Sequence, residues 1–272
     1  MKFIDLSSSA PAAIQGHTSK GNQPKWETGN IWYKADHMGY EALAEVVISH
    51  LLEKSNVPDY VLYNVVNIRY DGQTRIGCSS RNFRAKHEEL IPFERLHRAY
   101  HGQGLAQTLA KIPETAEQVR YTVEFVESVT GLDGVGTYLT RLLELDALFL
   151  NEDRHTNNLA VIRNQATGAF RLCPVFDSGL SLLSDLNDYP LDEDVFACIS
   201  RVRAKPFHRS FDEQVNAAEQ LYGLQLCLDF DQHDVSDALA AMAGIYDGAI
   251  LRRVETVIRE QMRKYPIYFS AQ

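Results

Sequence analysis

Two acidic residues and an asparagine near the middle of the chain have the spacing that phosphoryl-transfer chemistry requires. Asp153 and Asn158 lie five positions apart in LFLNEDRHTNNLAVI, and Asp177 follows nineteen positions after Asn158 in VFDSG. Phosphoryl transfer needs a carboxylate at the attacking hydroxyl and oxygen ligands that hold Mg²⁺ against the phosphates. We therefore expect Asp153 to accept the substrate proton, and Asn158 and Asp177 to bind Mg²⁺ beside ATP.

The segments around these residues predict a loop and a hairpin that could present them together. The range 137–150 has helical periodicity and ends just before the loop that carries Asp153. Two short apolar runs then flank a turn at 166–168, and we expect this hairpin to return Asp177 beside Asn158. A bare D-x-x-x-x-N pattern occurs by chance in many proteins, so the hypothesis depends on this joint context.

Three residues beside Asp153 and Asp177 have roles of their own. Ser178 stands where protein kinases carry the phenylalanine of Asp-Phe-Gly, so we expect metal binding at Asp177 without an aromatic switch. His155 either orders the loop by hydrogen bonding or acts as a second catalytic base, and the ordering role is favoured. Arg154 could pair with an acidic residue or with a phosphate.

A lysine and two glutamates upstream suit a phosphate-contacting lysine that is held by a helical carboxylate. Lys34 follows a predicted strand at 31–33 and precedes a predicted helix over 39–54. Glu41 and Glu45 lie four positions apart on one face of that helix, so either could pair with Lys34. Glu45 is the favoured partner.

The N-terminal segment GHTSKGNQPK contains two glycines that could let backbone N–H groups approach phosphates. Gly16 and Gly21 are these residues, and Ser19 lies between them. The segment does not have the P-loop pattern, because Asn22 follows Gly21. Taken alone, it would be interpreted as a flexible loop.

The predicted elements divide the chain into an N-lobe, 1–85, and a C-lobe, 86–272. The N-lobe contains the helix and a small antiparallel sheet, with Asp71-Gly72 as a tight hairpin turn. The C-lobe is mostly helical, and its helices are expected at 90–110, 116–129, 137–150, 211–222, 235–243 and 248–265. This composition predicts the α+β class, with the catalytic loop and the metal site in the second lobe.

Composition and charge exclude several classes of partner. The 272 residues include 27 Lys and Arg against 36 Asp and Glu, and the net charge of −9 would repel a nucleic acid backbone. No apolar run is long enough to span a membrane, and the N-terminus does not have the pattern of a signal peptide. We therefore expect no nucleic acid or membrane partner and a cytoplasmic location, with secretion by a signal-less route left open.

Several motifs together resemble the HipA-like kinase superfamily and, within it, the CtkA-like bacterial branch. They are GNQPK, WYKAD, GYEALAE, NEDRHTNN and PVFDSGLSL, and the D-R-H-x-x-N loop is also similar to that of phosphatidylinositol 3-kinase relatives. The resemblance implies a bilobal protein-kinase-like fold, ATP and Mg²⁺ as cofactors, and serine/threonine phosphorylation of a protein substrate. It also implies autophosphorylation at Ser19.

Two other functions fit part of the same pattern. A lipid or small-molecule kinase would use the same catalytic residues, but the segment 181–194 after Asp177 is acidic, which disfavours a phosphoinositide substrate. A pseudokinase acting as a nucleotide-binding module would lack transfer. Because Asp153, Asn158 and Asp177 are all present, an active protein kinase is the favoured hypothesis.

Overall fold

The computed structural model describes residues 1–9, 11 and 23–269, and the chain divides into two compact units. Unit 1 comprises Met1–Asn82, Phe176–Val202 and Cys227–Gln272, and unit 2 comprises Phe83–Val175 and Arg203–Leu226. The division predicted at residue 85 lies close to the first of these junctions. Residues beyond it contribute to both units.

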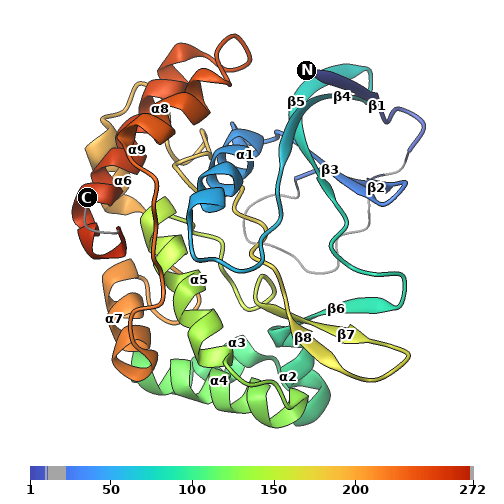
Figure 1. Ribbon diagram of the computed structural model, residues 1–272, viewed down its shortest axis with the longest axis vertical. Helices are drawn as coiled ribbons and strands as arrows, with labels where there is room; N and C mark the ends of the chain where they lie inside the picture. The colour runs from blue at the N-terminus through green and yellow to red at the C-terminus, as the bar shows by residue number, and fades with distance from the viewer. Residues whose placement is uncertain (10, 12–22, 270–272) are drawn as a thin grey trace. The chain divides into compact units, whose positions relative to one another are not determined.

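In the described part of unit 1, five strands form one sheet in the order β1-β4-β5-β3-β2 (Figure 1). The strands are β1 Lys2–Asp5, β2 Lys25–Thr28, β3 Ile31–Ala35, β4 Asn64–Tyr70 and β5 Gln73–Arg81. β1 pairs with β4 in parallel, whereas the other pairs are antiparallel. Strand β2 lies in a segment that the sequence analysis interpreted as loop, because glycine, serine, asparagine and proline dominate the residues before it.

Two-residue turns join two of the antiparallel strand pairs of this sheet, β2–β3 and β4–β5. Tyr70 pairs with Gln73, so the turn consists of Asp71 and Gly72, as predicted. Their φ angles are 50° and 71°, and this left-handed conformation at both positions matches the twist of the two strands. The range 29–30 forms the turn between β2 and β3 in the same way, with φ angles of 58° and 65°.

Helix α1, Glu41–Leu51, packs against the sheet and continues into a short 3₁₀ helix, η1, Leu52–Lys54 (Figure 1). Ten of its eleven residues are buried, which is typical of a helix that is covered on several sides. Oδ1 of Asp36 accepts a hydrogen bond from the Ala42 N–H at 2.7 Å and so caps the first turn. Gly39 precedes the helix where a Cβ atom would lie 2.1 Å from the Ser184 carbonyl oxygen. The start of α1 is therefore fixed against the backbone of the same unit.

The remaining elements of unit 1 come from the C-terminal part of the chain. They are α6 Val195–Arg201, α8 Gln232–Ala240, α9 Gly248–Lys264 and the 3₁₀ helix η2 Pro266–Tyr268. α8 packs against α1 and α9, and α9 also contacts α6. The helices predicted at 235–243 and 248–265 are thus confirmed, while α6 was not predicted.

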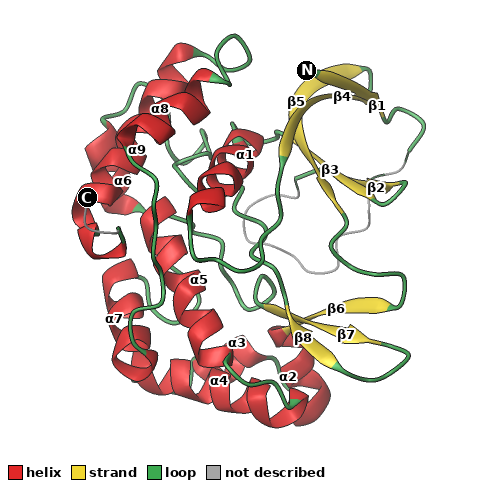
Figure 2. Cartoon of the chain, viewed as in Figure 1, coloured by secondary structure: helices red, strands yellow, loops and turns green. Residues whose placement is uncertain are grey.

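Unit 2 combines a three-stranded sheet, in the order β6-β7-β8, with helices (Figure 2). Its elements are β6 Glu88–Pro92, α2 Phe93–His101, α3 Leu105–Leu109, α4 Thr115–Thr130, α5 Val135–Phe149, β7 Ala160–Asn164, β8 Phe170–Leu172 and α7 Phe211–Tyr222. The prediction of a sheet-containing N-terminal region and a mainly helical remainder is confirmed. Within the described residues, no helix is long and apolar enough to cross a bilayer.

One predicted helix of unit 2 is wrong. The apolar periodicity of 90–110 suggested a single helix, but its start is strand β6, in which Ile91 pairs with Val161 of β7. The rest is divided between α2 and α3, because α2 ends at Gly102 with a left-handed φ of 72°. Pairing with a distant strand overrides the local helical pattern here, which sequence periodicity cannot detect.

Helix α5 leads directly to the predicted catalytic loop. It contacts α4 and α7, and twelve of its fifteen residues are buried. Gly136 allows close packing with α7, because a Cβ atom would lie 2.4 Å from Cδ1 of Tyr222. The helix ends at Leu150, whose φ of 53° reverses the chain direction. The loop therefore starts from a helix with a fixed position in unit 2.

Candidate functional site

Three of the predicted site residues meet in unit 1. Lys34 lies on β3, Glu45 on α1, and Asp177 at the start of the segment that returns to this unit. The Lys34 Nζ contacts Oε1 of Glu45 and lies 2.7 Å from Oδ1 of Asp177. One buried ammonium group is thus shared by two carboxylates, although their positions are far apart in the sequence.

The structure distinguishes the two glutamates that the sequence left as alternatives. Glu45 contacts Lys34 and also accepts a hydrogen bond from the Ser178 N–H at 3.0 Å. Glu41 instead accepts hydrogen bonds from the backbone N–H groups of residues 37–39, which lie just before α1. Glu45 therefore connects the lysine to the backbone beside Asp177, whereas Glu41 stabilises the entry to the helix.

Lys25 belongs to the same cluster and was not predicted as a site residue. Its Nζ lies 3.3 Å from Oδ1 and 3.4 Å from Oδ2 of Asp177. Lys25 pairs directly with Lys34 across the β2–β3 hairpin, so the two side chains are on the same face of the sheet. Two lysines at such a position repel each other, and the carboxylate of Asp177 offsets this repulsion. The Gly29-Asn30 turn is the sequence signal that could have revealed this pairing.

The backbone at Asp177 has an unusual conformation. Its φ is 60°, in the left-handed region that residues other than glycine rarely adopt. Such a conformation costs on the order of 1–3 kcal/mol and is often found at functional sites. The contacts with Lys25 and Lys34, and the bond from Ser178 to Glu45, hold the residue in place.

These contacts determine which groups of the cluster are charged. Burial would lower the pKa of Lys34, but the carboxylates of Asp177 and Glu45 raise it well above its ordinary value. Burial would likewise raise the pKa of Asp177, but Lys25 and Lys34 hold it well below its ordinary value. The cluster thus presents an ionised carboxylate and a permanently charged ammonium group at neutral pH.

In unit 2, Arg154 anchors the predicted catalytic loop. Its guanidinium group is buried and donates from Nε to Oδ2 of Asp146 at 2.9 Å and from Nη2 to Oδ1 at 3.0 Å. Asn151 also donates to Asp146, at 2.8 Å, and accepts from the Asp153 N–H at 3.1 Å. The acidic partner that the sequence left open for Arg154 is therefore Asp146 on α5. These bonds order the loop.

Asp153 is buried in this loop, and two side chains approach its carboxylate. The His155 Nε2 lies 3.7 Å from Oδ2, and the Lys205 Nζ lies 3.4 Å from Oδ1. Among the described residues, neither ring nitrogen of His155 has a hydrogen-bond partner. The ring therefore does not provide the loop-ordering hydrogen bonds that we expected of it. Lys205 lies 52 positions downstream and was not predicted.

Asn158 is oriented by the same loop. Its Nδ2 donates to the carbonyl oxygen of Asp153 at 2.8 Å, and its N–H donates to the carbonyl oxygen of His155 at 2.8 Å. Because the side-chain nitrogen makes this bond, the carboxamide oxygen is the atom left for a metal ion. Asn158 lies in unit 2 and Asp177 in unit 1, so their joint metal binding stays a prediction.

The predicted phosphate loop carries the site residues Gly16, Ser19 and Gly21, and all three lie outside the described residues.

In the described part of the chain, no cluster of three or more His, Cys, Asp or Glu side chains could hold a metal ion. Mg²⁺ commonly takes only one or two protein ligands and completes its shell with phosphates and waters. Asn158 and Asp177 each offer an oxygen donor of this kind.

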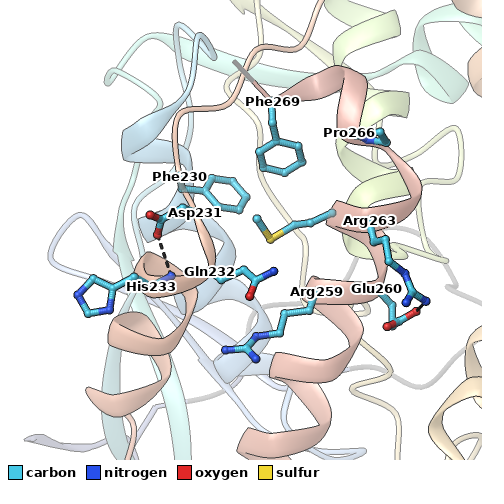
Figure 3. A pocket seen from close by; sticks show the side chains of 10 residues that line it. Phe230, Asp231, Gln232, His233, Arg259, Glu260, Arg263, Pro266 and Phe269 are labelled. Carbon is cyan, nitrogen blue, oxygen red and sulfur yellow. Dashed lines mark hydrogen bonds and ion pairs between the residues drawn. The ribbon is translucent and has the colours of Figure 1, made fainter. Parts of the chain in front are cut away.

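A pocket of about 690 Å³ elsewhere in unit 1 contains none of these residues (Figure 3). It lies where the start of α8 meets the last turns of α9, with Phe230 and Phe269 packed at right angles 5.3 Å apart. Asp231 caps α8 by accepting from the His233 N–H. The side chains at the rim, Arg259 and Arg263 among them, form ion pairs within their own helix. The lysine cluster of unit 1 and the predicted catalytic loop of unit 2 therefore stay the candidate functional residues.

Comparisons with known proteins support the fold. No family model matches the chain, and no curated protein matches it either. Among solved structures, the chain is similar to the crystal structure of a Helicobacter pylori proinflammatory kinase, CtkA, with a TM-score of 0.60 and 14% sequence identity. The match covers 96% of this chain and 94% of that one. The chain therefore has a mixed α/β fold like that of the CtkA kinase.

Proposed function

We propose that this protein is an ATP- and Mg²⁺-dependent phosphotransferase and that it phosphorylates serine or threonine residues of a protein substrate. The observation that carries the proposal is the contact of Lys34 with both Glu45 and Asp177. In active protein kinases, a strand lysine must be paired with a helical glutamate. The similarity to a kinase structure supports the same conclusion.

Each unit contributes two residues to the proposed reaction. In unit 1, Lys34 offers an ammonium group to the phosphates of ATP, and Asp177 offers a carboxylate to Mg²⁺. In unit 2, Asp153 offers a carboxylate to the substrate hydroxyl, and Asn158 offers its carboxamide oxygen to Mg²⁺. Bound Mg²⁺ would neutralise charge on the phosphates and favour departure of ADP.

The transfer step balances with ATP as the phosphoryl donor. The hydroxyl oxygen of the substrate forms a bond to the γ-phosphorus, and the bond from that phosphorus to the β,γ-bridging oxygen breaks. The electron pair of the broken bond leaves with ADP. The hydroxyl proton moves to the carboxylate of Asp153, which is buried and held by the bond from its N–H to Asn151.

The choice of a protein substrate comes from the sequence. The motifs around Lys34, Asp153 and Asp177 resemble the HipA-like superfamily and its CtkA-like branch, which implies serine/threonine protein kinase activity. The acidic segment 181–194 does not suit a phosphoinositide headgroup. Autophosphorylation at Ser19 and a cytoplasmic location are further parts of the proposal that come from the sequence alone.

Incubation with γ-labelled ATP and Mg²⁺ tests this function. Wild-type protein, with and without casein as a generic acceptor, should incorporate label into itself or into casein, and EDTA should abolish the incorporation. Asp153→Asn should lose it. A wild-type protein that binds Mg²⁺-ATP without transferring label would support a pseudokinase, and label in phosphoinositide vesicles alone would support a lipid kinase.

A further inference from the structure

Lys205 brings an ammonium group to the predicted base from a distant segment of unit 2. Its Nζ lies 3.4 Å from Oδ1 of Asp153, and the two residues are 52 positions apart. About a third of the Lys205 side chain is exposed, at 34%, whereas Asp153 is buried in the catalytic loop. The amine thus contacts the carboxylate while part of the side chain is exposed to solvent.

The segment that carries Lys205 is anchored on both sides of it. Ala204 and Phe207 are buried, and the Ala204 N–H donates to the carbonyl oxygen of Arg209 at 3.0 Å. The Phe207 N–H donates to Oε1 of Gln214 at 3.1 Å, and Gln214 is itself fully buried on α7. The contact of Lys205 with Asp153 is therefore supported by a fixed backbone, unlike that of an ordinary surface lysine.

The catalytic loop itself offers little positive charge to a transferring phosphoryl group. The guanidinium of Arg154 is buried and forms a paired interaction with Asp146. The ring of His155 approaches Oδ2, the other oxygen of Asp153, rather than Oδ1. Lys205 is the side chain that adds a full positive charge at Oδ1.

We propose that Lys205 is a catalytic residue that contacts the γ-phosphoryl group during transfer. The inference rests on the proposed function. The attacking hydroxyl must lie within hydrogen-bond reach of Asp153, so the phosphorus that it attacks lies close to the same carboxylate. An ammonium group 3.4 Å from that carboxylate can therefore reach a phosphoryl oxygen.

The charge of Lys205 matches the needs of the step. As the bond to the hydroxyl oxygen forms and the bond to ADP breaks, negative charge is spread over the three equatorial oxygens of the phosphoryl group. A preorganised ammonium group stabilises this charge more than it stabilises bound ATP. Removal of the amine should therefore lower the rate of transfer more than the affinity for nucleotide.

The variants Lys205→Met and Lys205→Arg test the proposal. The control variant is Lys111→Met, which removes an exposed lysine of unit 2 that donates to Gln103. Lys205→Met should lower kcat about 100-fold with an unchanged KM for ATP, as expected for loss of one preorganised donor. Lys205→Arg should recover part of the rate, because it keeps the charge. Lys111→Met should match the wild type.

Binding measurements give a readout that does not depend on turnover. Calorimetry with Mg²⁺-ADP, alone and with aluminium fluoride, compares the ground state with a mimic of the transferring phosphoryl group. Lys205→Met should bind Mg²⁺-ADP as the wild type does and lose most of the affinity gained with aluminium fluoride. A matched melting temperature would show that the variant is folded.

Three outcomes would overturn the inference. If Lys205→Met retains the wild-type kcat and the aluminium fluoride effect, Lys205 is not catalytic, while the kinase function stands. If its Mg²⁺-ADP affinity and melting temperature fall together, and Lys205→Arg restores both without restoring the aluminium fluoride effect, the lysine has a structural role. If the wild type neither transfers phosphate nor responds to aluminium fluoride, the proposed function fails together with the inference.

Discussion

The Nζ of Lys34 lies 2.7 Å from Oδ1 of Asp177, although 143 positions separate the two residues in the chain. Lys25 contacts the same carboxylate from the neighbouring strand. A carboxylate between two ammonium groups is stabilised in its ionised form, which is the form that binds Mg²⁺. When Mg²⁺-ATP binds, the two lysines can exchange this carboxylate for the phosphates.

Asp177→Asn should abolish Mg²⁺-dependent binding of ATP. The amide removes the negative charge that the metal needs and leaves Lys25 and Lys34 without their shared partner. Calorimetric titration with ATP, in Mg²⁺ and in EDTA, measures the change. Asp192→Asn, in an exposed loop of the same unit, is the control. An unchanged affinity in Mg²⁺ would remove Asp177 from the metal site.

Glu45→Gln and Glu41→Gln should have different effects, although the residues lie one helical turn apart. Loss of the Glu45 charge frees Lys34 from one partner and should weaken Mg²⁺-ATP binding about tenfold, a typical cost for a lost buried charge-assisted contact. Glu41 caps backbone N–H groups before α1, so Glu41→Gln should lower the melting temperature and leave the affinity unchanged. Equal losses of affinity in both variants would contradict this assignment.

Stability should fall as the pH rises, in part because of Asp36. Burial, together with the nearby Glu41 carboxylate, raises the pKa of Asp36 to about 8. The unfolded chain has an ordinary aspartate with a pKa near 4, so between about pH 4 and pH 8 the folded state holds a proton that the unfolded state has released. The free energy of unfolding therefore decreases across this range.

Asp36→Asn tests this pH dependence, because an amide cannot ionise. The melting temperature of the variant should improve relative to the wild type as the pH is raised from about 5 to about 8. Part of the slope should remain, since burial also raises the pKa of Glu144 in unit 2. Asp71→Asn, in the exposed hairpin turn, serves as the control. A constant difference from the wild type at every pH would contradict the prediction.

Local sequence signals were sufficient for much of the fold. The Asp71-Gly72 turn, the helix over α1 and the helix over α7 depend on residues close in sequence, and each lies where it was predicted. Strand β6 was predicted as helix because its pairing with β7 is a long-range interaction. The parallel pairing of β1 with β4 likewise cannot be read from local patterns.

In the candidate site, too, local patterns predicted some residues and long-range contacts hid others. The pattern around Asp153 and Asn158 was visible because the two residues share one short loop. The choice between Glu41 and Glu45 stayed open, since helical spacing places both on one face. The structure separates them, because Glu41 accepts hydrogen bonds from the backbone before α1, whereas Glu45 contacts Lys34. Lys25 and Lys205 were missed because each reaches its aspartate across a distance in sequence that no spacing rule covers.

Asp153→Asn should separate nucleotide binding from transfer. The carboxylate acts on the substrate hydroxyl, so Mg²⁺-ATP affinity should stay within about twofold while kcat falls about 100-fold or more, as is typical for loss of a general base. Calorimetry and single-turnover transfer to casein measure the two quantities. A matched melting temperature would show that the loop still folds, because the bond from the Asp153 N–H to Asn151 does not depend on the carboxylate.

The double variant Asp153→Asn/Lys205→Met adds a test of whether the two side chains act as one unit. The ammonium group of Lys205 and the carboxylate of Asp153 are 3.4 Å apart and would serve the same transition state. Residues that act together lose much less in combination than the product of their single losses, so the double variant should be only slightly slower than the slower single variant. Fully multiplicative losses would mean that the two residues act independently. For the single variant Asp153→Asn, a fall in Mg²⁺-ATP affinity that parallels the fall in kcat would instead mean that Asp153 is a metal ligand or a structural residue.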